Sequence, residues 1–185
     1  MTDIDTIGIV GAGQMGHGIA QVAAVSGFDV VLSDISDQVL DEANRAIESS
    51  LEKFVAREKL TDENRQEALD RLTMTTELPD AADSDLVVEA VTEQEEVKFD
   101  VFGQIDDHAP DDAILASNTS SISITKLANV TDRPHRVIGM HFMNPVPIMQ
   151  LVEVIRGLAT DDETFEAVES VAEQMNKKVV VANDY

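Results

Sequence analysis

The sequence predicts an α/β fold in which helices cover both faces of a doubly wound, mostly parallel β-sheet. Two observations lead to this prediction. Short apolar runs, typical of buried strands, alternate along the chain with longer stretches whose apolar residues recur at helical spacing. In addition, the first apolar run leads through a glycine-rich turn directly into a helix, as in the βα units of such sheets.

The N-terminal part of the chain is predicted to form one βαβ unit followed by a helical excursion. The strand Thr6–Val10 precedes a helix whose apolar residues run from 15 to 25, and a second strand follows at 28–32. Apolar residues between 36 and 59 lie on one face of a long amphipathic helix. Thr61 then caps a further helix that reaches about residue 72.

The remaining sequence continues the alternation. Strands are predicted at 73–75, 85–91, 113–116, 137–140, 150–154 and 178–181, with helices at 95–108 and 163–175. No internal repeat, low-complexity segment or linker interrupts this pattern. We therefore expect a single domain that spans residues 1–185.

Composition limits the classes of partner. Acidic residues outnumber basic ones by 36 to 13, and the net charge of −23 repels nucleic acids and anionic membranes. The chain has no cysteine, which excludes disulfides and thiolate metal sites, and we expect no metal. Its first residues lack the features of a signal peptide and no apolar run reaches transmembrane length, so a cytoplasmic location is expected. The scattered acids indicate an acidic surface and a halophilic origin.

The residues between the first strand and the first helix form a dinucleotide-binding pattern. Gly11 permits a tight turn, Gly13 lets the backbone approach a pyrophosphate, and Gly16 allows the helix to pack closely. Gln14 and Met15 open the helix, whose free N–H groups favour an anion. We expect this turn to bind the phosphates of a dinucleotide in a Rossmann-type domain.

Asp34 ends the second strand, near the offset of roughly 20 residues at which such domains place a ribose-binding acid. Its carboxylate can accept hydrogen bonds from ribose hydroxyls and would repel a 2′-phosphate. Ile35 and Ser36 provide no arginine for such a phosphate. The expected cofactor is therefore NAD rather than NADP.

His141 ends an apolar strand at the carboxyl edge of the predicted sheet, where ligands bind in such folds. Glu153 lies on the next predicted strand, and an antiparallel return would bring its carboxylate to the imidazole. Such a pair can act as a general base. A lone histidine is usually structural, so spacing alone leaves both interpretations open.

Polar residues follow two further strands. The run 117–121 can cap a helix that begins near Ile122, contact a substrate, or do both. Glu93 and Lys98 open the helix after the strand at 85–91. By themselves they are interpreted as ordinary surface charges, because a spacing of five residues forms no standard helical pair.

Four segments together resemble L-3-hydroxyacyl-CoA dehydrogenases: residues 11–16, 87–91, 117–121 and 141–147. The first is generic to Rossmann enzymes, whereas the serine-rich and histidine-proline segments are specific to this family. The resemblance extends over nearly the whole chain. It implies reversible, NAD-dependent oxidation of (3S)-3-hydroxyacyl-CoA to 3-oxoacyl-CoA, in fatty-acid β-oxidation or butanoate metabolism.

The resemblance also implies residue roles. His141 would be the general base for the substrate 3-hydroxyl, Glu153 would orient its imidazole, and Ser120 would hold the hydroxyl oxygen. Four residues match cofactor contacts of the family: Glu93, Lys98, Ser120 and Asn144. Family members continue into an all-helical domain that completes the acyl-CoA site and forms a homodimer. That domain is absent from this chain, so we expect a fragment that binds NAD and turns over poorly by itself.

Two other functions stay open at this point. One is a non-catalytic NAD-binding redox or interaction module, against which the retention of Ser120, His141 and Glu153 argues. The other is a dehydrogenase of sugar acids of the gulonate type, since relatives with a similar histidine segment act on such substrates. An acyl-CoA enzyme needs cations for the coenzyme A phosphates. The candidates, which are equally interpretable as solvated helix charges, are Lys53, Arg57, Lys59 and Arg65.

Overall fold

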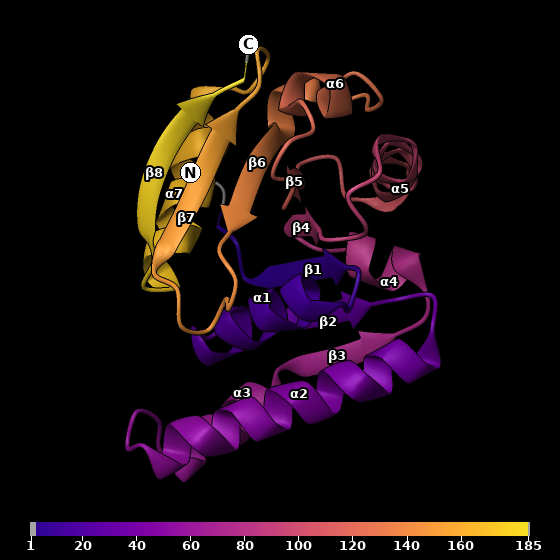
Figure 1. Ribbon diagram of the computed structural model, residues 1–185. Helices are drawn as coiled ribbons and strands as arrows, with labels where there is room; N and C mark the ends of the chain where they lie inside the picture. The colour runs from indigo at the N-terminus through magenta and orange to yellow at the C-terminus, as the bar shows by residue number, and fades with distance from the viewer. Residues whose placement is uncertain (1–2, 185) are drawn as a thin grey trace.

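The computed structural model describes residues 3–184, so Met1, Thr2 and Tyr185 of the predicted domain lie outside the described residues. One eight-stranded sheet organises the chain, in the order β3-β2-β1-β4-β5-β6-β7-β8 (Figure 1). The strands are β1 (Thr6–Val10), β2 (Asp29–Ser33), β3 (Leu72–Thr75), β4 (Leu86–Glu89), β5 (Ile114–Ser117), β6 (Val137–Phe142), β7 (Leu151–Arg156) and β8 (Lys178–Asn183). All neighbours pair in parallel except β6 and β7. The predicted fold class is confirmed.

Helices cover both faces of the sheet. The α-helices are α1 (Gln14–Val25), α2 (Asp37–Ala56), α3 (Asp62–Asp70), α4 (Leu78–Ala82), α5 (Glu95–His108), α6 (Ile124–Ala128) and α7 (Asp162–Gln174), with a 3-10 turn η1 at Pro134–Arg136. Residues of α1, α2, α3 and α7 pack in one hydrophobic cluster, and residues of α4, α5 and α6 pack in the other. The sheet therefore separates two cores.

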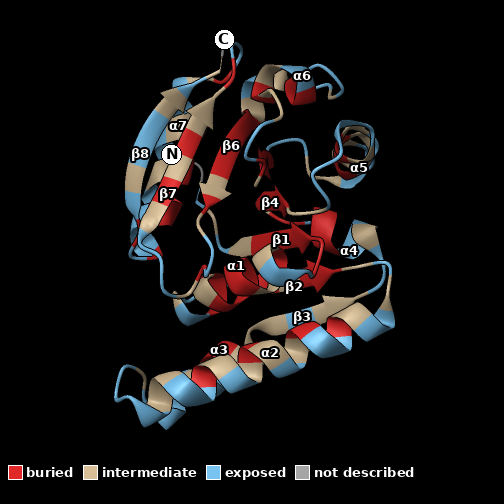
Figure 2. Ribbon diagram, viewed as in Figure 1, coloured by how far each residue is buried: buried red, intermediate tan, exposed pale blue. Residues whose placement is uncertain are grey.

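Alternation along the strands explains how one sheet serves both cores. In β4, Leu86 and Val88 join the first cluster while Val87 joins the second, because successive side chains of a strand point to opposite faces. Figure 2 shows the result, with buried residues concentrated in the central strands and exposed ones along the outer side of α2. Among residues 3–184, no helix is both long and apolar enough to span a membrane.

Two short elements escaped the prediction: α4, with five residues, and η1, with three. Both are too short for a helical period to appear in the sequence. The helix expected near Ile122 begins at Ile124, because Ser123 is its N-cap and accepts a hydrogen bond from the Lys126 N–H. The run 117–121 therefore does not cap this helix. The long helix α2 ends at Ala56 rather than at residue 59. Glu58 adopts the left-handed φ of 57°, which a right-handed helix does not contain.

Candidate functional site

The glycine-rich turn connects β1 to α1 at the carboxyl edge of the sheet. Gly11 adopts φ 103°, a left-handed conformation that favours glycine, and its N–H donates to the Ser33 carbonyl at 2.8 Å. A Cβ on Gly16 would lie 1.7 Å from the Gly11 carbonyl oxygen, so α1 approaches the turn more closely than any side chain allows. The conformations expected of Gly11 and Gly16 are both present.

The turn leaves room for a phosphate group. A Cβ built on Gly13 would meet no atom of the described residues within 4 Å, so the backbone there faces open space. Gly13 is also the N-cap of α1, without a side-chain capping bond in the described structure, and the first turn carries no acidic residue. The helix dipole and the N–H groups of Gln14 and Met15 are therefore suited to an anion. These residues fit the diphosphate of a dinucleotide.

Asp34 lies directly beside this turn. Its Oδ2 accepts the Ala12 N–H at 2.9 Å and its Oδ1 accepts the Ser36 N–H at 3.1 Å, which fixes the carboxylate at the end of β2. Ile35 is 97% exposed and presents no charge. A fixed acid in this place fits ribose hydroxyls and opposes a 2′-phosphate.

The expected contact between His141 and Glu153 is present. The antiparallel register of β6 and β7 sets the two residues directly opposite each other, and His141 Nδ1 lies 2.9 Å from Glu153 Oε2. Both side chains are partly exposed, at 20% and 40%. Because Nδ1 is engaged by the carboxylate, Nε2 is the nitrogen left to meet another group.

One cavity brings together residues from four separate segments. It is lined by ten residues, among which the predicted site residues are Met15, Glu93, Ser120, His141 and Asn144. Asn118, which the sequence analysis did not single out as a site residue, helps to join two of these segments: its Oδ1 accepts the Phe142 N–H at 2.9 Å and so ties the loop after β5 to β6. The cavity opens beside the glycine-rich turn, since Met15 belongs to the first turn of α1.

Glu93 organises the serine-rich loop after β5. Its Oε1 accepts the Ser120 N–H at 3.0 Å, the Ser121 N–H at 3.2 Å, and hydroxyl hydrogen bonds from Thr119, Ser120 and Ser121. Burial alone would raise the pKa of Glu93. The Thr119 hydroxyl, the nearby Lys98 charge and the loop donors outweigh that effect and lower its pKa to about 2. The carboxylate is thus ionised at neutral pH.

The interpretation of Lys98 as a surface charge is wrong. Its side chain is 1% exposed, and its Nζ lies 2.6 Å from Glu89 Oε1 and 3.4 Å from Glu93 Oε2. Glu89, fully buried, also accepts the Val91 N–H at 2.7 Å and the Ser117 hydroxyl at 2.6 Å. Lys98 therefore connects a buried carboxylate to the carboxylate that holds the serine-rich loop. The signal in the sequence is a glutamate within an apolar run, because a buried charge requires a partner.

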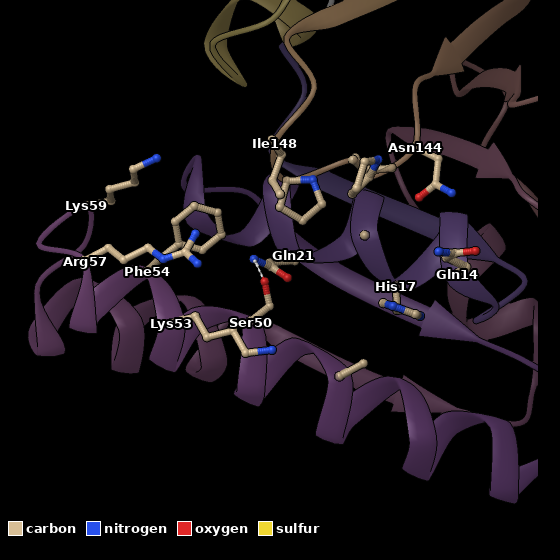
Figure 3. A pocket seen from close by; sticks show the side chains of 15 residues that line it. Gln14, His17, Gln21, Ser50, Lys53, Phe54, Arg57, Lys59, Asn144 and Ile148 are labelled. Atoms are coloured by element: carbon tan, nitrogen blue, oxygen red, sulfur yellow. Dashed lines mark hydrogen bonds between the residues drawn. The ribbon is translucent and has the colours of Figure 1, made fainter.

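A second pocket lies between α1, α2 and the segment after β6 (Figure 3). Figure 3 shows Lys53, Arg57 and Lys59 toward one end, and Gln14 and Asn144 toward the other. Three of the four basic candidates thus line one pocket. Arg65 does not belong to its lining and contacts Glu52 at 3.4 Å instead.

Comparison with known proteins places the chain in a family. Residues 6–185 match the family model described as 3-hydroxyacyl-CoA dehydrogenase, NAD binding domain. A 3-hydroxybutyryl-CoA dehydrogenase of Bradyrhizobium diazoefficiens is 50% identical over 98% of this chain and 62% of its own length. A probable 3-hydroxybutyryl-CoA dehydrogenase of Deinococcus radiodurans is 53% identical over 96% of this chain and 64% of its own. The chain thus spans less than two thirds of the length of these relatives.

A solved structure agrees with these relatives. The crystal structure of (S)-3-hydroxybutyryl-CoA dehydrogenase from Ralstonia eutropha superposes with a TM-score of 0.96 at 48% identity, covering 99% of this chain and 65% of that one. Among residues 3–184, no group of histidine and acidic side chains is arranged to hold a metal ion. The chain belongs to the 3-hydroxyacyl-CoA dehydrogenase family, matches its NAD-binding domain, and has NAD as its cofactor.

Proposed function

We propose that this chain is the NAD-binding part of an enzyme that reversibly oxidises (3S)-3-hydroxyacyl-CoA to 3-oxoacyl-CoA. The observation that carries the proposal is that His141, paired with Glu153, lines the same cavity as Ser120 and Asn144, beside the glycine-rich turn. A base, an oxygen-binding hydroxyl and a dinucleotide site in one cavity are what alcohol oxidation requires.

In the proposed reaction, the substrate loses a proton from its 3-hydroxyl and a hydride from C3, and a carbonyl forms. NAD, when bound, supplies the acceptor for the hydride. His141 takes the proton on Nε2, because Nδ1 is held by Glu153. The Glu153 carboxylate orients the ring and stabilises the imidazolium that results. In the reverse direction, the protonated His141 returns the proton to the oxygen.

The remaining site residues hold the reactants. We assign the Ser120 hydroxyl to the 3-oxygen of the substrate and to the nicotinamide half of NAD, together with Asn144. The turn of Gly11, Gly13 and Gly16, with Gln14 and Met15 at the helix start, would hold the diphosphate. Asp34 would hold the adenosine ribose, and Glu93 the other ribose. Since Lys98 is 1% exposed, its part is to hold Glu93 in place rather than to make an open contact.

The basic pocket supports a coenzyme A thioester as the substrate class. Lys53, Arg57 and Lys59 line one pocket in a chain whose net charge is −23, so they form a local exception to an acidic molecule. The three cations would attract the phosphates of coenzyme A, whereas a sugar acid such as gulonate has no phosphate group for them to bind. Since the relatives compared above are named for 3-hydroxybutyryl-CoA, this thioester is the substrate to test first.

The proposal extends to the whole protein. The relatives are longer than this chain, and we propose that the full protein includes the helical domain of the family, forms a homodimer and works in the cytoplasm. The net charge of −23 supports an acidic surface adapted to a salt-rich cytosol and argues against nucleic-acid or membrane partners.

His141 and Glu153 variants test the assignment. In the full-length protein, His141→Gln should lower kcat/KM for (3S)-3-hydroxybutyryl-CoA by about 10²–10⁴-fold, because it removes the base. Glu153→Gln should lower it less, because an amide can still orient the ring. NAD affinity, measured by calorimetry, should stay unchanged in both. His108→Gln, at the exposed end of α5, is the matched control. Unchanged turnover in His141→Gln would refute the catalytic assignment.

A further inference from the structure

The ammonium group of Lys177 is bound inside the protein by two carbonyl groups of one short turn. Its Nζ lies 2.6 Å from the Val146 oxygen and 2.7 Å from the Met149 oxygen. The residue is 9% exposed, and burial lowers the pKa of the ammonium from its ordinary value. Hydrogen bonds from a charged donor are stronger than those between neutral groups. The cost of burying this charge is thus offset at one particular turn.

The end of α7 directs Lys177 to this place. Asn176 adopts the left-handed φ of 58°, its N–H donates to the Glu173 carbonyl at 2.8 Å, and the Lys177 N–H donates to the Ala172 carbonyl at 2.9 Å. These two bonds form a Schellman motif, which reverses the chain at the helix end. The next residue, Lys178, donates its N–H to the Gln150 carbonyl at 2.7 Å. Backbone and side chain together attach the segment after α7 to the turn.

The turn held by Lys177 is a wall of the basic pocket. Residues 145–149 form one helical turn, with the Ile148 and Met149 N–H groups donating to the Pro145 carbonyl at 3.0 and 2.9 Å. Val146, Pro147 and Ile148 line the pocket that also contains Lys53 and Arg57, and Ile148 is visible at its edge in Figure 3.

The same turn packs against α1 without spare room. A Cβ on Gly18 would lie 2.9 Å from the Val146 Cβ, so helix and turn are in the closest contact that glycine permits. The turn is therefore clamped between the backbone of α1 and the ammonium of Lys177. Loss of the ammonium would release one side of the clamp and leave two carbonyl groups without their donor.

We propose that Lys177 is a positioning residue that fixes the 145–149 turn as the wall of the acyl-CoA pocket. The identity of the ligand rests on the proposed function, whereas the hold on the turn does not. Lys177 is not part of the lining of this pocket, and it contacts the turn rather than the site of the chemistry. Its loss should therefore weaken thioester binding and leave NAD binding unchanged.

The test compares Lys177→Met with Lys178→Met. Both remove one lysine charge at neighbouring positions, but Lys178 is exposed and contributes only its backbone N–H, which donates to Gln150 just after the turn. In Lys177→Met, hydrogen exchange of the Ile148 and Met149 amides should become about tenfold faster or more, while amides of the central strands keep their protection. Acetoacetyl-CoA should bind about tenfold more weakly by calorimetry. Lys177→Arg, which keeps a charged donor, should retain most of the wild-type amide protection and most of the wild-type affinity.

The outcomes separate the two proposals. Unchanged exchange in Lys177→Met, equal effects in Lys178→Met, or loss of protection throughout the molecule would each overturn the positioning role. If the turn loosens but thioester affinity does not change, the link between the turn and the pocket is wrong. If wild-type protein binds no acetoacetyl-CoA while the turn still loosens in Lys177→Met, the proposed function fails and the hold of Lys177 on the turn stands.

Discussion

Replacing Lys98 with methionine should destabilise the domain strongly. The Lys98 side chain is 1% exposed and that of Glu89 is fully buried, with 2.6 Å between Nζ and Oε1. Methionine fills much of the same space but leaves the Glu89 carboxylate buried without its counter-charge. Removing one member of a buried ion pair costs about 3–5 kcal/mol, a large part of the roughly 5–15 kcal/mol by which a domain is stable. The Val91 N–H and the Ser117 hydroxyl still donate hydrogen bonds to Glu89, so we expect a loss near the lower end of this range.

Urea unfolding followed by far-ultraviolet circular dichroism measures this effect, since the chain has no tryptophan. Adding Glu89→Gln to Lys98→Met should restore much of the lost stability, because the unpaired buried charge is then removed. Lys126→Met breaks an exposed pair with Glu95 and should leave the unfolding midpoint unchanged. A loss below about 1 kcal/mol in Lys98→Met, or no recovery in the double variant, would refute the reasoning.

Three further predictions follow from the site and the charge. The folded-state pKa of Glu93 is lowered from 4.5 to about 2, so the ionised carboxylate stabilises the fold fully above pH 4.5 and loses this contribution as the pH falls toward 2. Glu93→Gln should therefore flatten the dependence of stability on pH between these two values, and an unaltered dependence would contradict this prediction. Gly13→Ala should fold normally yet bind NAD at least about tenfold more weakly, because its methyl group enters the open space beside the turn, whereas Gly16→Ala should fail to fold stably. At a net charge of −23, raising KCl from about 0.1 to 1 M should raise the urea midpoint as the screening length shortens from about 10 to 3 Å, and a lower midpoint would argue against an acidic surface adapted to salt.

Local features of the site could be predicted from the sequence. The turn at Gly11 and Gly16 needs only the order of strand, glycines and helix, because its geometry is set within a few residues. The pairing of His141 with Glu153 needed one further assumption, an antiparallel return between neighbouring strands, which β6 and β7 provide. In each case the deciding contacts come from adjacent elements.

Other contacts could not be predicted in this way. Lys98 and Glu89 lie on consecutive elements, but they meet only because α5 folds back over the end of β4, and their spacing matches no helical pair. Asn118 reaches Phe142, 24 residues away, and Lys177 reaches Val146, 31 residues away. No periodic pattern encodes such bonds, since they depend on the order of strands in the sheet and on the path of each loop.

NADH formation by the full-length protein tests the central claim most directly. The protein is mixed with NAD and either (3S)-3-hydroxybutyryl-CoA, its (3R) enantiomer or gulonate, and absorbance is followed at the NADH band. We predict turnover of the (3S) thioester and little or none of the other two, with activity lost in His141→Gln. Oxidation of gulonate in place of the thioester, or no oxidation of either by protein that binds NAD, would contradict the account.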